Sequence, residues 1–422
     1  MEKNNSIPVT PTSPSERIVS LDVLRGFALF GILVVNIQAF AMITAALQNP
    51  NAFGDLTGLN YVVALFTRVF VQNKFWTIFS LLFGAGIWLM TSKMKEKGKK
   101  PAGIHYRRML WLLLIGLLHA YVLWYGDILF TYALCGLLVY LFRNLSPKKL
   151  LIIGLVGICL CSGILGLVEW SLPHWPQEML EQQLENWQPG EEAIANEIAI
   201  YQGGWWKQME HRVPFTLGFQ ISSFLIFMLW SAGGLMLIGM AFFKWGILSA
   251  KKSKAFYRNM LIIGAVIGVP LVLWGWIISA RHNWAFEYAM FKGIQLNYWG
   301  SMFLSLAYIA GIMLICQSRL MPRITRSLAA VGRMAFTNYL MHTLICTTLF
   351  YGHGFGLFGK INRTGQFLIV VLILAFQMWF STLWLKHFRF GPFEWLWRSL
   401  TYRKFQPMRI AARKSEMMSV EY

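Results

Sequence analysis

Residues 21–43 read LDVLRGFALFGILVVNIQAFAMI, and the fold class follows from this stretch. A helix needs about 20 mostly apolar residues to cross the hydrocarbon core of a bilayer, and this stretch meets that length. The basic flank before it is typical of a signal peptide, but the apolar run is too long and no small-x-small cleavage pattern precedes Gln48. We therefore expect a first transmembrane helix that stays in the protein.

The composition of the whole chain agrees with a membrane protein. Of its 422 residues, 56% are hydrophobic and only 13% are charged, whereas a soluble domain carries about 25% charged residues. The sequence therefore predicts an all-α fold, a polytopic transmembrane helical bundle with about ten transmembrane helices. The other spans are expected near residues 74–90, 108–125, 128–142, 149–171, 217–243, 259–280, 299–317, 328–350 and 366–387.

The formal net charge of +20 comes from short basic clusters that lie between apolar stretches. Because no single face or long block collects these residues, nucleic acid is not an expected partner. The clusters fall at every second connection, which predicts a bacterial plasma-membrane protein with both termini in the cytoplasm. They lie at residues 93–108, 143–149, 244–258, 319–326 and 389–414.

The sequence divides into three parts. Residues 1–16 are polar and proline-containing, so we expect a mobile cytoplasmic N-terminus. Residues 17–390 form the transmembrane domain, with a glutamate-rich extracytoplasmic insertion at 172–213. Residues 391–422 are expected to be a basic cytoplasmic tail. An amphipathic stretch at 60–71 is predicted to lie in the outer interface.

The cysteines and histidines do not predict a metal centre. All five cysteines lie in apolar stretches and none forms a CxxC pair, so we expect them to pack as small apolar residues without disulfides. Two histidines within spans, His119 and His342, raise the alternative of a bound metal. No third ligand stands at a clear spacing, and no metal is expected.

Ionisable residues within spans are the first candidates for function. Asp22 and Arg25 are three residues apart and share a helix face near the cytoplasmic end. They either form an ion pair there, or Arg25 binds an anionic phosphate that arrives from the cytoplasm. Asn36 lies farther out on the same span and is either part of a helix–helix contact or a polar group of the site.

The most informative segment is GLLHAYVLWYGDIL at residues 116–129. It places His119 in the outer half of a span and Asp127 at a Gly-Asp turn between two helices. A buried neutral histidine is a candidate general base, and a carboxylate can fix its tautomer. The two residues are about two helical turns apart, so pairing requires the turn at Gly126 to fold Asp127 back. Alternatively, His119 bonds to a neighbouring helix and Asp127 caps the next one.

A second set of polar residues lies in the predicted span 328–350. Arg333 is near its inner end, and Asn338 and His342 follow on one helical face. This repeats the arrangement of the first span, which suits a molecule with an anionic head inside and a reacting end in the membrane. His342 is the second candidate base, and Asn36, Asn338 or Tyr339 are candidates to stabilise an oxyanion.

Several of these segments resemble the YeiB-like family. The resemblance covers most of the chain in the same order. The Leu-Asp-x-x-Arg-Gly opening is also shared with a wider superfamily of membrane acyltransferases, which includes the lysosomal heparan-alpha-glucosaminide N-acetyltransferase and bacterial O-acyltransferases. The segments that carry the resemblance are residues 17–32 with Asn36, 74–84, 116–129, 332–340 and 390–398.

This resemblance implies an acyltransferase-like domain at 17–390 that moves an acyl group from cytoplasmic acyl-CoA or acetyl-CoA to an extracytoplasmic or membrane acceptor, such as a glycan or lipid. Arg25 and Arg333 would hold the phosphates of the donor. The heparan enzyme has its catalytic histidine just after the first helix, but residues 37–58 contain no histidine here. His119, assisted by Asp127, is therefore the expected base.

The same buried polar residues are also compatible with a non-enzymatic transporter or lipid-binding membrane protein, in which they would line a substrate path. Membrane lipids are expected partners in either case. The sequence leaves open whether copies of the chain assemble into a homo-oligomer.

Overall fold

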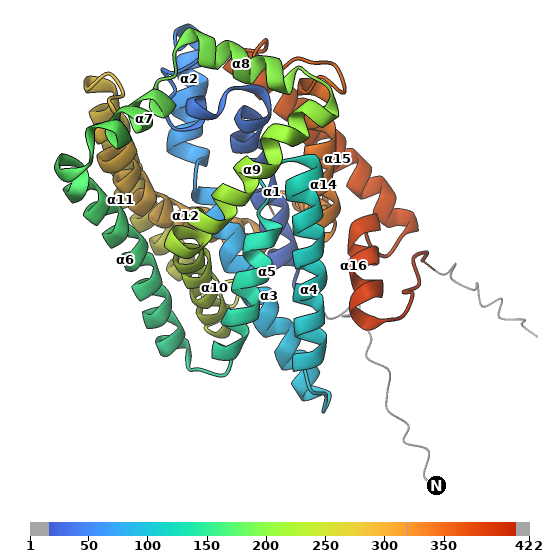
Figure 1. Cartoon of the computed structure of the whole chain (residues 1–422). Coiled ribbons are helices and arrows are strands. Elements are labelled where there is room, and N and C mark those ends of the chain that lie inside the picture. The colour runs from blue at the N-terminus through green and yellow to red at the C-terminus, as the bar shows by residue number, and fades with distance from the viewer. Residues whose placement is uncertain (1–16, 319, 411–422) are drawn as a thin grey trace, which may run out of the picture.

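The computed structural model describes residues 17–318 and 320–410, which form a bundle of helices (Figure 1). Residues 1–16, expected to be mobile, and residues 411–422 of the expected tail lie outside the described residues. The predicted all-α, polytopic fold is confirmed. The helices are α1 (Val19–Ala41), α2 (Gly58–Phe66), α3 (Lys74–Glu96), α4 (Ala102–Leu118), α5 (Leu129–Val139), α6 (Pro147–Ser171), α7 (Gln177–Trp187), α8 (Glu191–Tyr201), α9 (Trp205–Ser223), α10 (Leu229–Lys244), α11 (Lys254–Arg281), α12 (Ile294–Ser318), α13 (Pro322–Arg333), α14 (Ala335–Phe350), α15 (Arg363–His387) and α16 (Pro392–Tyr402).

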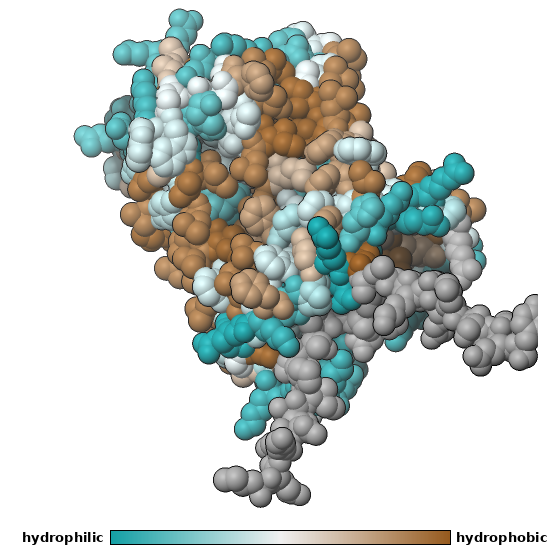
Figure 2. All heavy atoms as spheres, turned by 90° about the vertical axis from the view of Figure 1, so that its right-hand side faces the viewer, coloured by the Kyte–Doolittle hydropathy of each residue, from teal (hydrophilic) through white to brown (hydrophobic). Residues whose placement is uncertain are grey.

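Apolar side chains cover much of the outer surface of the bundle. Leu167 on α6 is 65% exposed and Leu372 on α15 is 69% exposed. Figure 2 shows a broad apolar surface across the middle of the molecule and hydrophilic side chains toward its upper and lower ends. Soluble monomers rarely expose apolar patches of this extent, so the bundle is that of a membrane protein.

Helix α1 lies in the middle of the bundle and packs against α3, α12, α13, α14 and α15. Leu24, Ala28 and Leu33 are fully buried. The close crossing of α1 with α13 requires glycine on both helices, because a Cβ at Gly332 would overlap the carbonyl oxygen of Asp22 and a Cβ at Gly26 would overlap that of Leu328. This crossing places the start of α1 beside the end of α13.

Eight helical segments in the described part of the chain are long and apolar enough to cross a membrane. They match eight of the predicted spans. The other two are shorter helices: the span predicted at 128–142 is α5 followed by a 3₁₀ turn, and the span predicted at 328–350 is not one helix. The prediction of a continuous ninth helix was therefore wrong, because the helix is interrupted at Met334, between α13 and α14.

The break has an identifiable physical cause in α16. Glu394 accepts hydrogen bonds from the backbone N–H groups of Phe336 (2.7 Å) and Thr337 (3.0 Å) and from the Thr337 hydroxyl. These donors belong to the first turn of α14, where an α-helix has no partners of its own for them. A carboxylate from a distant helix therefore caps α14 and allows the chain to turn at Met334.

The connections between helices differ at the two ends of the bundle. The α3–α4 and α5–α6 connections lie toward the lower end in Figure 1, and α7 and α8 cross the upper end. The basic clusters at 93–108 and 143–149 are therefore far from the glutamate-rich helices. The amphipathic stretch at 60–71 forms α2 and a π-helical turn at Thr67–Val71, and α3 starts at Lys74, where the second span was expected to begin.

Candidate functional site

The chain folds Asp127 back onto His119, as their pairing required. Helix α4 passes into a π-helical turn at His119–Leu123, Trp124 is extended, and the chain then bends at Tyr125, next to Gly126. A Cβ at Gly126 would overlap the Trp124 ring, so the tightness of this turn depends on glycine. The His119 Nδ1 atom lies 2.8 Å from Asp127 Oδ1, and the two side chains are 1% and 0% exposed.

Asp127 has two partners, because it pairs with His119 and also caps α5. Its Oδ2 accepts a hydrogen bond from the Phe130 backbone N–H at 2.7 Å, which caps the start of α5. Its Oδ1 meets His119. A carboxylate accepts hydrogen bonds only, so His119 Nδ1 carries a proton, and in the neutral imidazole Nε2 is left with a lone pair. The carboxylate thus fixes the histidine tautomer that can act as a base.

The Nε2 lone pair meets a residue that the sequence did not reveal. Thr343 on α14 lies with its Oγ1 2.8 Å from His119 Nε2 and is 1% exposed. With the tautomer above, the Thr343 hydroxyl donates this hydrogen bond. Threonine is common in transmembrane helices as a packing residue, and nothing in the local sequence distinguishes Thr343 from its neighbours.

Tyr339 stands one turn before Thr343 on α14 and also contacts the histidine. Its ring centroid lies 5.3 Å from that of His119, and its hydroxyl accepts a hydrogen bond from the Ile128 backbone N–H at 3.3 Å. The structure therefore brings His119, Asp127 and Tyr339 together from three separate segments. Of the predicted oxyanion-stabilising residues, Tyr339 is the one placed beside the histidine.

The predicted residues Asn338 and His342 take part in a different contact. Asn338 Nδ2 donates to Ser381 Oγ at 2.9 Å, and His342 Nε2 lies 2.8 Å from Gln377 Oε1. Both partners are on α15. Asn338 and His342 do share one helical face, as expected, but that face packs against α15 instead of facing His119.

A cavity of about 290 Å³, here called the arginine cavity, opens at the end where α1 starts. Ile128 and Tyr339 are among its lining residues, so it reaches the neighbourhood of His119. Arg25 and Arg333, the two arginines predicted to bind phosphate, both line it, and three more arginines accompany them. The full set is Arg17, Arg25, Arg108, Arg333 and Arg398.

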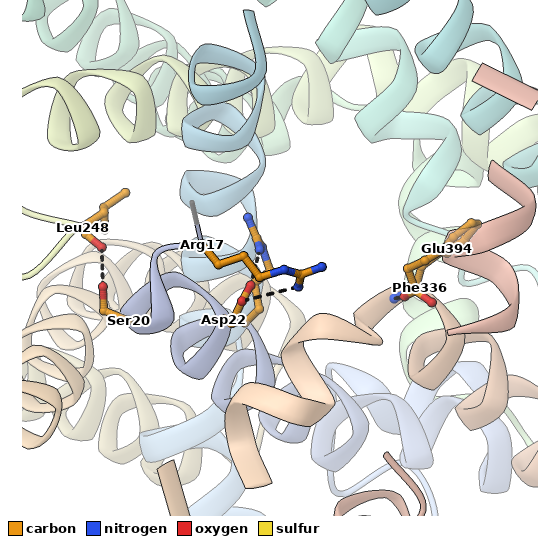
Figure 3. Close-up of polar contacts among 7 residues, drawn as sticks. Arg17, Ser20, Asp22, Leu248, Phe336 and Glu394 are labelled. Atoms are coloured by element: carbon orange, nitrogen blue, oxygen red, sulfur yellow. Dashed lines mark hydrogen bonds and ion pairs between the residues drawn. The ribbon is translucent and has the colours of Figure 1, made fainter. Parts of the chain in front are cut away.

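The carboxylates in this cavity do not balance its arginines. Asp22 accepts a 2.8 Å hydrogen bond from Arg25, which is the ion pair expected as one of the two alternatives, and lies 3.9 Å from Arg17 (Figure 3). The second acidic residue, Glu394, is engaged in capping α14 (Figure 3). Burial lowers the pKa of the Arg398 guanidinium. The excess of positive charge makes the cavity attractive to an anion.

A second cavity, of about 280 Å³, lies next to Trp124, whose ring contacts His119. It is here called the tryptophan cavity, because Trp124, Trp276 and Trp284 line it, and Asn36 lines it as well. The Trp124 ring lies edge-on to His119 with centroids 6.4 Å apart. His119 itself lines neither cavity, but its ring contacts Tyr339, which lines the arginine cavity, and Trp124, which lines the tryptophan cavity.

Comparison with known proteins yields relatives along nearly the full chain. Residues 242–404 match the family described as "Protein of unknown function (DUF418)". The chain is 34% identical over 415 residues to the uncharacterized protein YxaH of Bacillus subtilis (strain 168), covering 94% of this chain and 97% of that protein. It is 33% identical over 415 residues to the uncharacterized protein YeiB of Escherichia coli (strain K12), covering 93% of this chain and 98% of that one.

Proposed function

The chain belongs to the YeiB-like family, and we propose that it is a membrane-embedded acyltransferase. In this proposal it moves an acyl group, such as acetyl, from cytoplasmic acyl-CoA to an acceptor in the membrane or outside it. The observation that carries the proposal is the position of the buried His119–Asp127 pair next to residues that line two cavities, one of which is lined by five arginines. The resemblance to membrane acyltransferases supports the same reaction.

The arginine cavity is the donor site in this proposal. Guanidinium groups bind phosphate oxygens through paired hydrogen bonds, and the nucleotide part of CoA carries several phosphates. Arg25 and Arg333 would hold these phosphates, while the thioester reaches toward Tyr339. The basic clusters at the same end of the bundle support a cytoplasmic location for this mouth, with both termini in the cytoplasm of a bacterial plasma membrane.

The chemistry follows from the tautomer of His119. Nε2 accepts the proton of an acceptor hydroxyl or amine while the acceptor attacks the thioester carbonyl, and Asp127 stabilises the imidazolium that forms. The Tyr339 hydroxyl donates to the developing oxyanion. When the intermediate collapses, the C–S bond breaks and the CoA thiolate takes the proton back from His119. Since Thr343 occupies the Nε2 position in the structure, the acceptor hydroxyl replaces the Thr343 hydroxyl there.

The test is transfer by protein purified into lipid nanodiscs with labelled acetyl-CoA and a membrane extract, the product being identified by untargeted mass spectrometry. His119→Ala is expected to abolish transfer while acetyl-CoA binding and thermal stability persist. His342→Ala is the matched control and is expected to keep activity, because its Nε2 serves the α14–α15 contact. Full activity in His119→Ala would contradict the assignment of the base.

The alternative is a transporter or lipid-binding protein, and the presence of two cavities whose lining residues contact His119 favours it as a second candidate. In that case the cavities are two halves of one substrate path. Such a protein would show no affinity for acetyl-CoA and no acylated product, and mass spectrometry of the purified protein would find a retained lipid.

A further inference from the structure

Two basic side chains are buried at the start of α3 without a carboxylate partner. Arg68 is 6% exposed and Lys74 is 0% exposed. Lys74 Nζ donates to the Arg68 carbonyl oxygen and to Asn297 Oδ1, each at 2.8 Å. Arg68 Nη1 donates to Gln72 Oε1 at 2.8 Å. Among the described residues, no carboxylate forms an ion pair with either cation.

An unpaired charge inside a membrane protein is costly and marks a functional site more often than a structural one. Arg68 lines the tryptophan cavity, and its Nε atom is buried without a hydrogen-bond partner among the described residues. The neutral amide of Gln72 that meets Arg68 leaves its positive charge in place. The site therefore lacks a counterion, and the missing counterion has room in the cavity.

The other residues that line the tryptophan cavity indicate what kind of anion would fit beside Arg68. Arg363 adds a third cation, although its guanidinium is held by the carbonyl oxygens of Pro50, Phe53 and Asp55. Trp124, Trp276 and Trp284 line the cavity and give it aromatic walls against which a sugar ring can pack, although Phe40 stacks on one face of Trp124. Gln38 and Gln48 supply neutral polar groups in the same cavity. This combination fits a sugar that carries an oxyanion.

We infer that the tryptophan cavity binds an oxyanion-bearing sugar through Arg68, with phosphate or carboxylate as the anionic group. The inference rests on the proposed function in one respect: this sugar would be the acyl acceptor, because Trp124 joins the cavity to His119. Lys74 does not itself line the cavity.

Binding is measured without acyl-CoA, with glucose 1-phosphate, glucuronate and neutral glucose as probes for the protein in nanodiscs. Wild-type protein is expected to bind one of the two anions at least tenfold more tightly than glucose. The preferred anion identifies the group as phosphate or carboxylate. Arg68→Gln is expected to lose this preference, and Arg68→Lys to keep part of it. Arg281→Gln, an exposed arginine at the end of α11, is the matched control and is expected to bind as wild type does.

Gln72→Glu tests the same inference with the guanidinium intact. It places a carboxylate at the position that meets Arg68 Nη1, so the protein supplies its own counterion. This variant is expected to stay folded and to lose anion binding about as completely as Arg68→Gln does. Wild-type protein that binds neither anion better than glucose, or a Gln72→Glu variant that binds like wild type, would overturn the inference.

The two proposals fail in different ways. If anion binding depends on Arg68 but no acyl transfer occurs, the acyltransferase proposal fails and the sugar site stands. If transfer occurs to a neutral acceptor and Arg68→Gln leaves its rate unchanged, the sugar site fails and the acyltransferase stands.

Discussion

His119 gains its chemical character from two residues on different segments. Asp127 holds the Nδ1 proton and Thr343 meets Nε2, each at 2.8 Å. Neither contact alone distinguishes a base from a buried structural histidine, because histidines often bond to neighbouring helices. The distinguishing feature is the location of the pair next to residues that line two cavities, one of which has excess positive charge.

Asp127→Asn tests the role of the carboxylate at this scale. The asparagine oxygen can still accept the Phe130 N–H, so the cap of α5 is preserved. The asparagine NH2 then faces His119 Nδ1 and donates to it, so the neutral imidazole carries its proton on Nε2 and cannot act as the base. The kcat value is therefore expected to fall by at least roughly 100-fold, within the range for general base catalysis. The KM for acyl-CoA should stay near the wild-type value, as initial rates over a range of acetyl-CoA concentrations would show. An unchanged kcat would leave Asp127 as a cap alone.

The break between α13 and α14 determines where the residues of the proposed donor site lie. It allows Arg333 to end one helix at the arginine cavity, while the next helix begins at Ala335 and brings Tyr339 and Thr343 to His119. The local sequence around Met334 contains no proline, and the residue that caps α14 is Glu394 on α16. Such a break depends on a contact between distant segments.

Burial raises the pKa of Glu394, and the hydrogen bonds from Thr337 and Phe336 only partly oppose this effect. A carboxyl group whose pKa is higher in the folded protein binds more protons there than in the unfolded chain, so its contribution to stability falls as pH rises. Glu394→Gln removes the titration. The melting temperature of the wild type, relative to Glu394→Gln, is therefore expected to fall between pH 4 and pH 7. A difference that stays constant across these pH values would contradict this.

The two ends of the molecule differ in the charge of the residues that lie there. The arginine cavity opens at the end where α1 starts, and the glutamate-rich α7 and α8 cross the opposite end (Figure 1). His119 contacts residues that line both cavities. A reaction with donor and acceptor on different sides of a membrane requires such an arrangement.

Cysteine labelling tests the proposed orientation of the protein in the membrane. In a background with the five native cysteines replaced by alanine, Lys148→Cys and Glu192→Cys place single thiols at exposed positions on α6 and α8. A membrane-impermeant maleimide added to intact spheroplasts is expected to label Glu192→Cys. Lys148→Cys should react only after the membrane is permeabilised. The reverse pattern would place the arginine cavity on the outer side and remove the cytoplasmic donor from the proposal.

The sequence by itself determined those features that depend on local composition and helical period. Apolar length predicted the membrane bundle and the start of α3 at Lys74, and three-residue spacing predicted the Asp22–Arg25 pair. Only the tertiary structure decided which helices meet. It turned His342 toward Gln377, brought Thr343 to His119, and added Arg108 and Arg398 to the arginine cavity. The physical reason is that apolar burial and helix geometry act over neighbouring residues, whereas these contacts join segments whose packing no local pattern encodes.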